Sequence, residues 1–168
     1  MKKILLSMLM VSFVGLTIIA CSKGSSVKEI IEKAKIEGKN WSEDDWMQAY
    51  KQVMIASKPY IIEQYKILEP LLKNEEMLYT DKDQAEIEYR KLEPKLEKLK
   101  RKYSELVAQS EEFNNLMIMN NTTDNIINKV LMNEEFIQWV QDLYAECGID
   151  DNMLDASSYL FTEIVSSK

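Results

Sequence analysis

Mostly apolar residues recur at alternating intervals of four and three between positions 85 and 117. This heptad spacing puts all of them on one face of an α-helix, whereas one face of a β-strand repeats every second residue. The positions are Ala85, Tyr89, Leu92, Leu96, Leu99, Tyr103, Leu106, Ser110, Phe113 and Met117. The segment is therefore predicted to be helical, with an apolar face that packs on other helices.

Pro94 lies within this segment but away from its apolar face. A proline inside a helix removes a hydrogen bond and crowds the preceding turn, at a cost of about 3 kcal/mol. The spacing nevertheless keeps its phase on both sides of Pro94. We therefore expect one long helix over about residues 81–118, with a kink at the proline, although the pattern leaves open whether Pro94 kinks the helix or breaks it.

The composition of the chain is typical of helical proteins. Its 168 residues include only four glycines and three prolines, and Glu, Lys, Leu, Ile and Met dominate. We find no convincing strand pattern. The predicted fold class is all-α, a multi-helix bundle with one long kinked helix and no sheet, in which residues 27–168 form a single domain.

Local signals place the helices before this segment. Apolar residues at helical spacing from Val27 to Ala34 precede Gly38, which predicts a helix that ends at the glycine. Ser42 is then predicted to cap a helix, with Asp45 completing a capping box and with Trp41 and Trp46 as a hydrophobic staple. An alternative interpretation of this acidic, Trp-flanked stretch is a ligand site.

Prolines suggest where the capped helix ends. We expect it to stop at Lys58, because Pro59 suits the first turn of a new helix. That helix would run toward Tyr79 with a kink at Pro70.

Three shorter helices are expected after a break at residues 120–123. Gly148 is placed to end the second of them in a left-handed conformation. Asp150 is placed to cap the third, with Ile149 and Leu154 as its staple.

The first 20 residues have the layout of a secretory signal. Lys2 and Lys3 precede an apolar stretch that is short for a membrane span and carries three hydroxyl groups. The residues Ile18, Ile19, Ala20 and Cys21 resemble the lipobox of bacterial lipoproteins. The resemblance implies that Ile18, Ile19 and Ala20 form the cleavage-site recognition sequence and that Cys21 receives a diacylglycerol and becomes the first residue. An ordinary signal with an incidental cysteine is the alternative.

The resemblance also implies a location. Ser22 follows the cysteine where lipoproteins kept at the inner membrane of many two-membrane bacteria carry Asp, so we expect an outer-membrane protein that faces the periplasm. Residues 1–20 would be removed as the signal peptide, and residues 21–26 would form the lipidated cysteine and a short tether. Five tether residues span less than about 20 Å, so the helical domain would stay close to the bilayer.

Composition argues against several kinds of chemistry. After cleavage the chain has 19 basic and 28 acidic residues, a formal charge of −9, which argues against nucleic-acid binding. The chain has no histidine and no common hydrolase or nucleotide-binding motif, so we expect no catalytic residue, metal or cofactor and no enzymatic activity. Cys147 is expected to be a buried, unreactive thiol, and Met117 and Met119 are expected to be core residues and not copper ligands.

One stretch is basic within this acidic chain. Seven basic and two acidic residues lie between Arg90 and Lys102, which suggests a surface for a partner or an anionic ligand. The candidate surface comprises Arg90, Lys91, Lys95, Lys98, Arg101 and Lys102. The alternative is a solvated helix face with ion pairs from Glu86 to Arg90 and from Glu97 to Arg101.

These observations favour a membrane-anchored helical lipoprotein of the bacterial cell envelope. The membrane would be reached through the lipid anchor, and another envelope protein would be the binding partner. The alternative function is a periplasmic carrier of an apolar or anionic small molecule, held in a cavity lined by Met, Tyr and Trp side chains.

Overall fold

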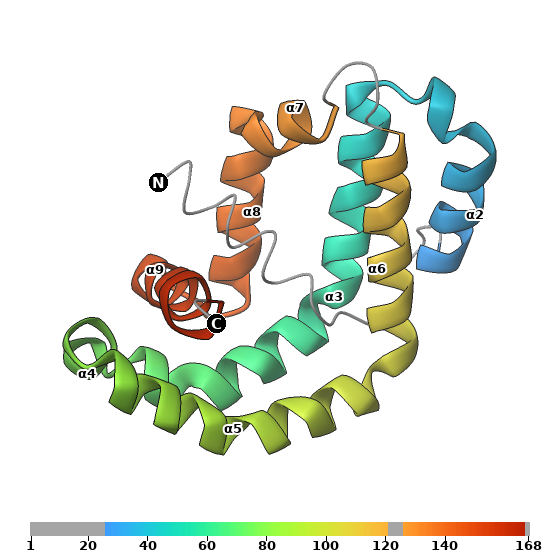
Figure 1. The fold of residues 1–168 in the computed structure, drawn as a ribbon. Coiled ribbons are helices and arrows are strands. Elements are labelled where there is room, and N and C mark those ends of the chain that lie inside the picture. Colours follow the sequence, from blue (N-terminus) through green and yellow to red (C-terminus); the bar gives the residue numbers. More distant parts are fainter. Residues whose placement is uncertain (1–25, 121–125, 167–168) are drawn as a thin grey trace.

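The computed structural model describes residues 26–120 and 126–166, and these residues form an all-helical bundle (Figure 1). The predicted fold class is confirmed, because no strand occurs in the described part of the chain. Its elements are α2 (Val27–Glu37), η1 (Gly38–Asn40), α3 (Glu43–Leu72), α4 (Glu75–Thr80), α5 (Lys82–Lys102), α6 (Ser104–Met119), α7 (Ile126–Met132), α8 (Glu134–Glu146), α9 (Asp151–Tyr159) and η2 (Leu160–Val165). The proposed lipobox and cleavage site lie outside the described residues.

The predicted capping signals are confirmed at several helix ends. Ser42 accepts a hydrogen bond from the backbone N–H of Asp45, whose carboxylate accepts one from the backbone N–H of Ser42. The rings of Trp41 and Trp46 pack edge to face with their centroids 4.7 Å apart, as a staple requires. The cap therefore accounts for this acidic, Trp-flanked stretch.

The end of α8 also follows its sequence signal. Gly148 has φ +78°, and the N–H groups of Gly148 and Ile149 donate to the carbonyls of Ala145 and Tyr144. This is a Schellman arrangement, which satisfies carbonyl groups that the helix end would leave unpaired. Asp150 then caps α9 by accepting from the backbone N–H of Met153 at 2.8 Å.

The prediction that a helix ends at Lys58 is wrong, because α3 continues through Pro59 and Pro70 to Leu72. Pro59 is exposed, whereas the apolar face continues past it with Tyr60 and Ile61, which are 3% and 2% exposed. Figure 1 shows that α3 bends along its length. The packing of this continuous face outweighs the hydrogen bond lost at an exposed proline.

The prediction of a single helix over residues 81–118 is corrected in its details. The chain stays helical through Pro94 but leaves helical geometry at Tyr103, which has φ −113° and ψ 28° and separates α5 from α6. The apolar face continues on both sides of this corner, with Leu99 and Leu106 buried. The heptad spacing thus marks a continuous buried face and not a continuous helix.

One core connects the helices. Its centre is a series of aromatic rings in contact, with centroids 4.7–6.1 Å apart, formed by Trp41, Trp46, Phe113, Tyr50, Phe136 and Trp139. These residues come from the approach to α3 and from α3, α6 and α8. Because the described helices share one cluster of buried apolar residues, they have the core of a unit that can fold alone.

Helices α2 and α6 pack side by side, with contacts from the end of α2 to the middle and the end of α6. Lys35 in α2 pairs with Glu112 in α6 at 2.8 Å, and a Cβ on Gly38 would lie 3.4 Å from the side-chain nitrogen of Asn120. Because later residues of α2 meet later residues of α6, the two helices run parallel (Figure 1). Helix α2 is five residues shorter than α6, so it begins beside the middle of α6.

Candidate functional site

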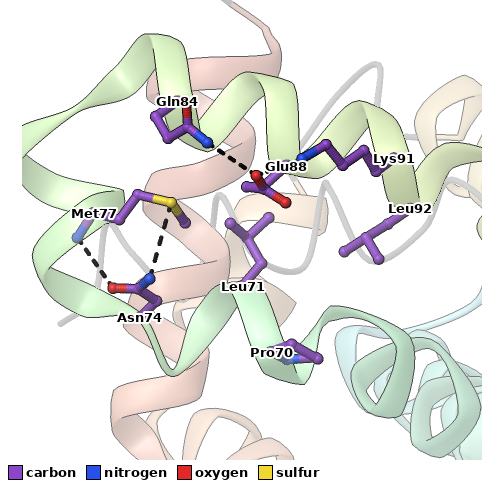
Figure 2. A pocket seen from close by; sticks show the side chains of 8 residues that line it. All are labelled: Pro70, Leu71, Asn74, Met77, Gln84, Glu88, Lys91 and Leu92. Carbon is purple, nitrogen blue, oxygen red and sulfur yellow. Dashed lines mark hydrogen bonds and ion pairs between the residues drawn. The ribbon is translucent and has the colours of Figure 1, made fainter.

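A groove of about 380 Å³ lies where α3 ends and α4 and α5 begin (Figure 2). Four of its lining residues are apolar and four are polar: Pro70, Leu71, Met77 and Leu92, and Asn74, Gln84, Glu88 and Lys91. Half of these residues are exposed, so this is a surface groove and not an enclosed cavity.

Two helix caps shape the groove. Asn74 ends the turn after α3 and accepts a hydrogen bond at 3.3 Å from the backbone N–H of Met77 in the first turn of α4. Asp81 accepts one at 3.0 Å from the backbone N–H of Gln84 in the first turn of α5. These two caps reverse the chain within a few residues, so that α5 packs back along α3.

The α5 side of the groove is a hydrogen-bonded row. Glu88 accepts from the Gln84 amide at 2.9 Å and from the Lys91 ammonium group at 2.7 Å. These residues lie one helical turn apart, so the row follows the axis of α5. Figure 2 shows it beside the apolar side chains of Leu71 and Leu92.

This arrangement is suited to holding an apolar group. Leu71 is 3% exposed and forms part of the floor, while Met77 and Leu92 are half-buried and contact the core. The polar groups around the floor already have partners within the chain. An apolar side chain of a partner could therefore displace water from the floor without breaking these hydrogen bonds, and burying one contributes about 1.5–3 kcal/mol.

The six basic residues predicted as a partner surface lie along α5, and all are exposed. Three have acidic neighbours: Arg90 pairs with Glu86 at 2.6 Å, Lys91 with Glu88 at 2.7 Å and Lys102 with Glu63 at 2.5 Å. The pair that the alternative interpretation expects between Glu97 and Arg101 does not form. Within the described residues Lys95, Lys98 and Arg101 have no acidic partner.

Glu63 anchors the end of this basic helix. Its carboxylate accepts hydrogen bonds from Lys102 and from the Tyr103 hydroxyl, the latter at 2.6 Å. Both bonds lower the pKa of Glu63 below its ordinary value, and the bond from Lys102 has the larger effect. The rings of Tyr60 and Tyr103 also pack edge to face, and burial raises the pKa of Tyr60 to about 12.

A smaller groove of about 180 Å³ lies between α2 and α3. Its lining includes Ile30, Trp41, Asp45 and Ala49. Asp45 serves the helix cap described above, and Trp41 packs on Trp46. The fully buried Nε1 of Trp46 has no hydrogen-bond partner among the described residues, but Trp46 does not line this groove.

The remaining candidates from the sequence are a thiol and two thioethers. Cys147 is partly buried, and burial raises the pKa of its thiol, which lowers the thiolate fraction at neutral pH. Met117 is a core residue as predicted, whereas Met119 is 71% exposed, so that part of the prediction is wrong. No cluster of three or more His, Cys, Asp and Glu side chains suited to a metal ion occurs within residues 26–120 and 126–166.

The groove was not predicted from the sequence, although its two caps have recognisable signals. Asn74 precedes two glutamates and Asp81 precedes α5, a typical pattern for helix starts. These cap signals could not predict that α3 and α5 pack antiparallel, and the groove forms between them.

Comparisons with known proteins give no assignment: no family model, curated protein or solved structure matches the chain. Among the described helices, none is both long enough and apolar enough to cross a membrane.

Proposed function

We propose that this chain is a lipid-anchored helical protein of the bacterial cell envelope that binds another envelope protein in the groove between α3, α4 and α5. Cys21 carries the anchor, and the helical domain faces the periplasm from the outer membrane. The protein acts by binding and not by catalysis.

The observation that carries the binding proposal is the apolar floor of the groove next to a row of paired polar groups. Protein interfaces concentrate their binding energy in a few apolar side chains that fill pockets surrounded by polar contacts. Leu71 and Leu92 offer such a pocket, and the row from Gln84 to Lys91 offers the polar edge.

The anchor is supported by the lipobox-like residues 18–21 and by the short distance to the first helix. Two or three acyl chains attach a protein stably to a bilayer, because each buried methylene contributes about 0.8 kcal/mol. Only five residues separate Cys21 from Val27.

In-cell crosslinking tests the partner. A photoreactive amino acid replaces Gln84, which is exposed at the edge of the groove, and in a control it replaces Lys39, which is exposed on η1. We expect a discrete adduct with one envelope protein from position 84 and none from position 39. No adduct from either position, or the same adduct from both, would contradict the proposal.

A matched pair of variants locates the contact on the floor of the groove. Met77→Glu places a carboxylate in the floor, whereas Thr80→Glu places it on an exposed position of the same helix. Because desolvating an unpaired charge is costly, we expect Met77→Glu to reduce the adduct at least about tenfold and Thr80→Glu to leave it unchanged. Helix content and unfolding temperature of both variants establish that they are folded.

The volume of the groove favours one second function, a carrier of a small apolar molecule. About 380 Å³ lies within the range of about 300–1,000 Å³ of small-molecule sites. Native mass spectrometry of protein isolated from cells separates the two functions. A carrier retains a bound small molecule that Met77→Glu releases, whereas a protein-binding module has the mass of the lipidated chain alone or of its protein complex.

A further inference from the structure

The basic residues of α5 share one face of the helix. At about 100° per residue, Arg90, Lys91, Lys95, Lys98, Arg101 and Lys102 occupy an arc of about 140°. Glu86, Glu93 and Glu97 fall outside this arc on one flank of the helix, and Glu88 borders it on the other. From Arg90 onward the arc, which we call the basic face, contains no acidic residue, whereas Asp83 in the first turn of α5 lies within it.

Most of the basic face points away from the bundle, whereas Lys91 lines the groove and Lys102 pairs with Glu63 of α3. The apolar residues of α5, such as Leu92 and Leu99, contact the core from the opposite side of the helix. Figure 1 shows α5 along the lower edge of the molecule, with the other described helices on its inner side. The unpaired side chains of Lys95, Lys98 and Arg101 are thus free to meet an external surface.

Apolar groups lie in the same arc. Ile87 is 49% exposed, and Pro94 is exposed in the middle of the helix. A helix face that combines lysines and arginines with exposed apolar groups is suited to the boundary between headgroups and acyl chains.

The first residue of α2 lies on the same side of the molecule as the end of α5. Gly38 at the end of α2 lies beside Asn120 at the end of α6, and α2 is five residues shorter than α6. Val27 therefore lies level with the middle of α6, about 8 Å along the helix axis from the end of α5. Five residues after Cys21 reach up to about 18 Å, more than the diameter of about 10–12 Å of a helix with its side chains.

We propose that the basic face of α5 lies on anionic phospholipid headgroups of the bilayer that holds the Cys21 anchor. This inference rests on the anchor in the proposed function and adds the orientation of the domain on the membrane. The acidic remainder of the molecule then faces away from the bilayer.

The size of the face favours a lipid surface over an acidic protein. From Arg90 to Lys102 the helix is about 18 Å long and about 10–12 Å wide, which gives about 200 Å². Each partner in a stable protein interface buries about 800 Å². A bilayer needs no such area, because the acyl chains hold the protein and the cations only orient it.

Vesicle binding tests the inference without the anchor. The chain used is residues 22–168, which contains the complete described core and lacks the acylated cysteine. Its binding is measured to vesicles of phosphatidylcholine alone and of equal parts phosphatidylglycerol and phosphatidylcholine, at about 0.1 M salt, where charges are screened over about 10 Å. We expect at least about tenfold tighter binding to the anionic vesicles, which higher salt weakens.

Two variants with the same charge change identify the face. Lys95→Gln/Lys98→Gln removes two unpaired cations from the basic face, whereas Lys39→Gln/Lys129→Gln removes two exposed, unpaired cations from other elements. Since each cation near an anionic surface strengthens binding about fivefold, we expect the first variant to lose at least about tenfold and the second to lose less than about twofold.

Three results would overturn the inference: equal binding to both vesicle types, an equal loss in both variants, or no vesicle binding together with binding to soluble polyglutamate. The last result would assign the face to an acidic protein. Because residues 22–168 carry no acyl group, none of these results depends on whether Cys21 is lipidated in cells. A missing anchor is detected separately, by the mass of the N-terminal peptide of the cellular protein.

Discussion

Tyr103 donates a hydrogen bond from its hydroxyl group to the carboxylate of Glu63 over 2.6 Å, and this bond joins the corner between α5 and α6 to the middle of α3. The same carboxylate accepts a hydrogen bond from Lys102. The one residue that leaves helical geometry between the two helices is thus tied to the central helix of the bundle. The corner allows α5 to pack along α3 while α6 packs along α2.

Tyr103→Phe tests the contribution of this bond. The variant keeps the ring that packs on Tyr60 and loses only the hydroxyl group. We expect the free energy of unfolding to fall by about 1 kcal/mol, the net contribution of one partly buried hydrogen bond. Urea denaturation measures it, and a variant as stable as the original chain would show that packing alone holds the corner.

Glu63 also predicts a dependence of stability on pH. Its pKa in the folded chain is lowered by Lys102 and Tyr103, so folding favours the ionised carboxylate. The resulting stability is complete above the unfolded pKa of about 4.3 and is lost as the pH falls through the folded pKa. Glu63→Gln should therefore lower stability at neutral pH and reduce its fall in acid. Denaturation at several acidic pH values measures this, and parallel curves for the two chains would contradict it.

Gly38 leaves room for the largest buried ring. A Cβ at Gly38 would lie 3.1 Å from Cζ2 of Trp46, which is 0% exposed and packed between Trp41 and Phe113. Because Trp41 and Phe113 pack against this ring, we expect the crowding to outweigh the stability gained when alanine restricts the unfolded chain. We expect Gly38→Ala to cost about 1 kcal/mol in the free energy of unfolding.

The neighbouring exposed Lys39 provides the control for this measurement. Lys39→Ala should change the free energy of unfolding by less than about 0.5 kcal/mol. If Gly38→Ala were at least as stable as the original chain, Trp46 would have space to move, and the proposed close packing would be wrong.

The exposed Pro94 lies inside α5, where its nitrogen cannot donate a helical hydrogen bond. Replacing it removes a cost of about 3 kcal/mol but also makes the unfolded chain more flexible. We therefore expect Pro94→Ala to raise the free energy of unfolding by about 1–2 kcal/mol, with Lys95→Ala as a nearly neutral control. A loss of stability in Pro94→Ala would show that the fold requires the bend that proline produces.

Sequence patterns predicted the helix ends that are fixed by contacts between residues close together in the sequence. Ser42 with Asp45 and Gly148 with Asp150 mark helix ends by hydrogen bonds between residues that are near in sequence. The heptad spacing identified the buried face from Ala85 to Met117, because burial depends on side-chain position.

The errors arose where distant contacts decide the structure. Pro59 suggested a helix start, but the buried face of α3 continues past it. The corner at Tyr103 is hydrogen-bonded to Glu63, far away in sequence, and no local pattern marks it. The groove likewise requires α3 and α5 to lie side by side, so Leu71 and Leu92 could not be paired from the sequence.

The central claim is that Cys21 anchors the chain to a membrane, and mass spectrometry of the N-terminal peptide tests it most directly. The protein is isolated from both the membrane and the soluble fractions of its native cells and digested. We expect the first residue to be Cys21 carrying a diacylglycerol, and we expect Cys21→Ser to block this processing and leave residues 1–20 attached. An N-terminal peptide with an unmodified cysteine, on a protein free of membranes, would contradict the claim.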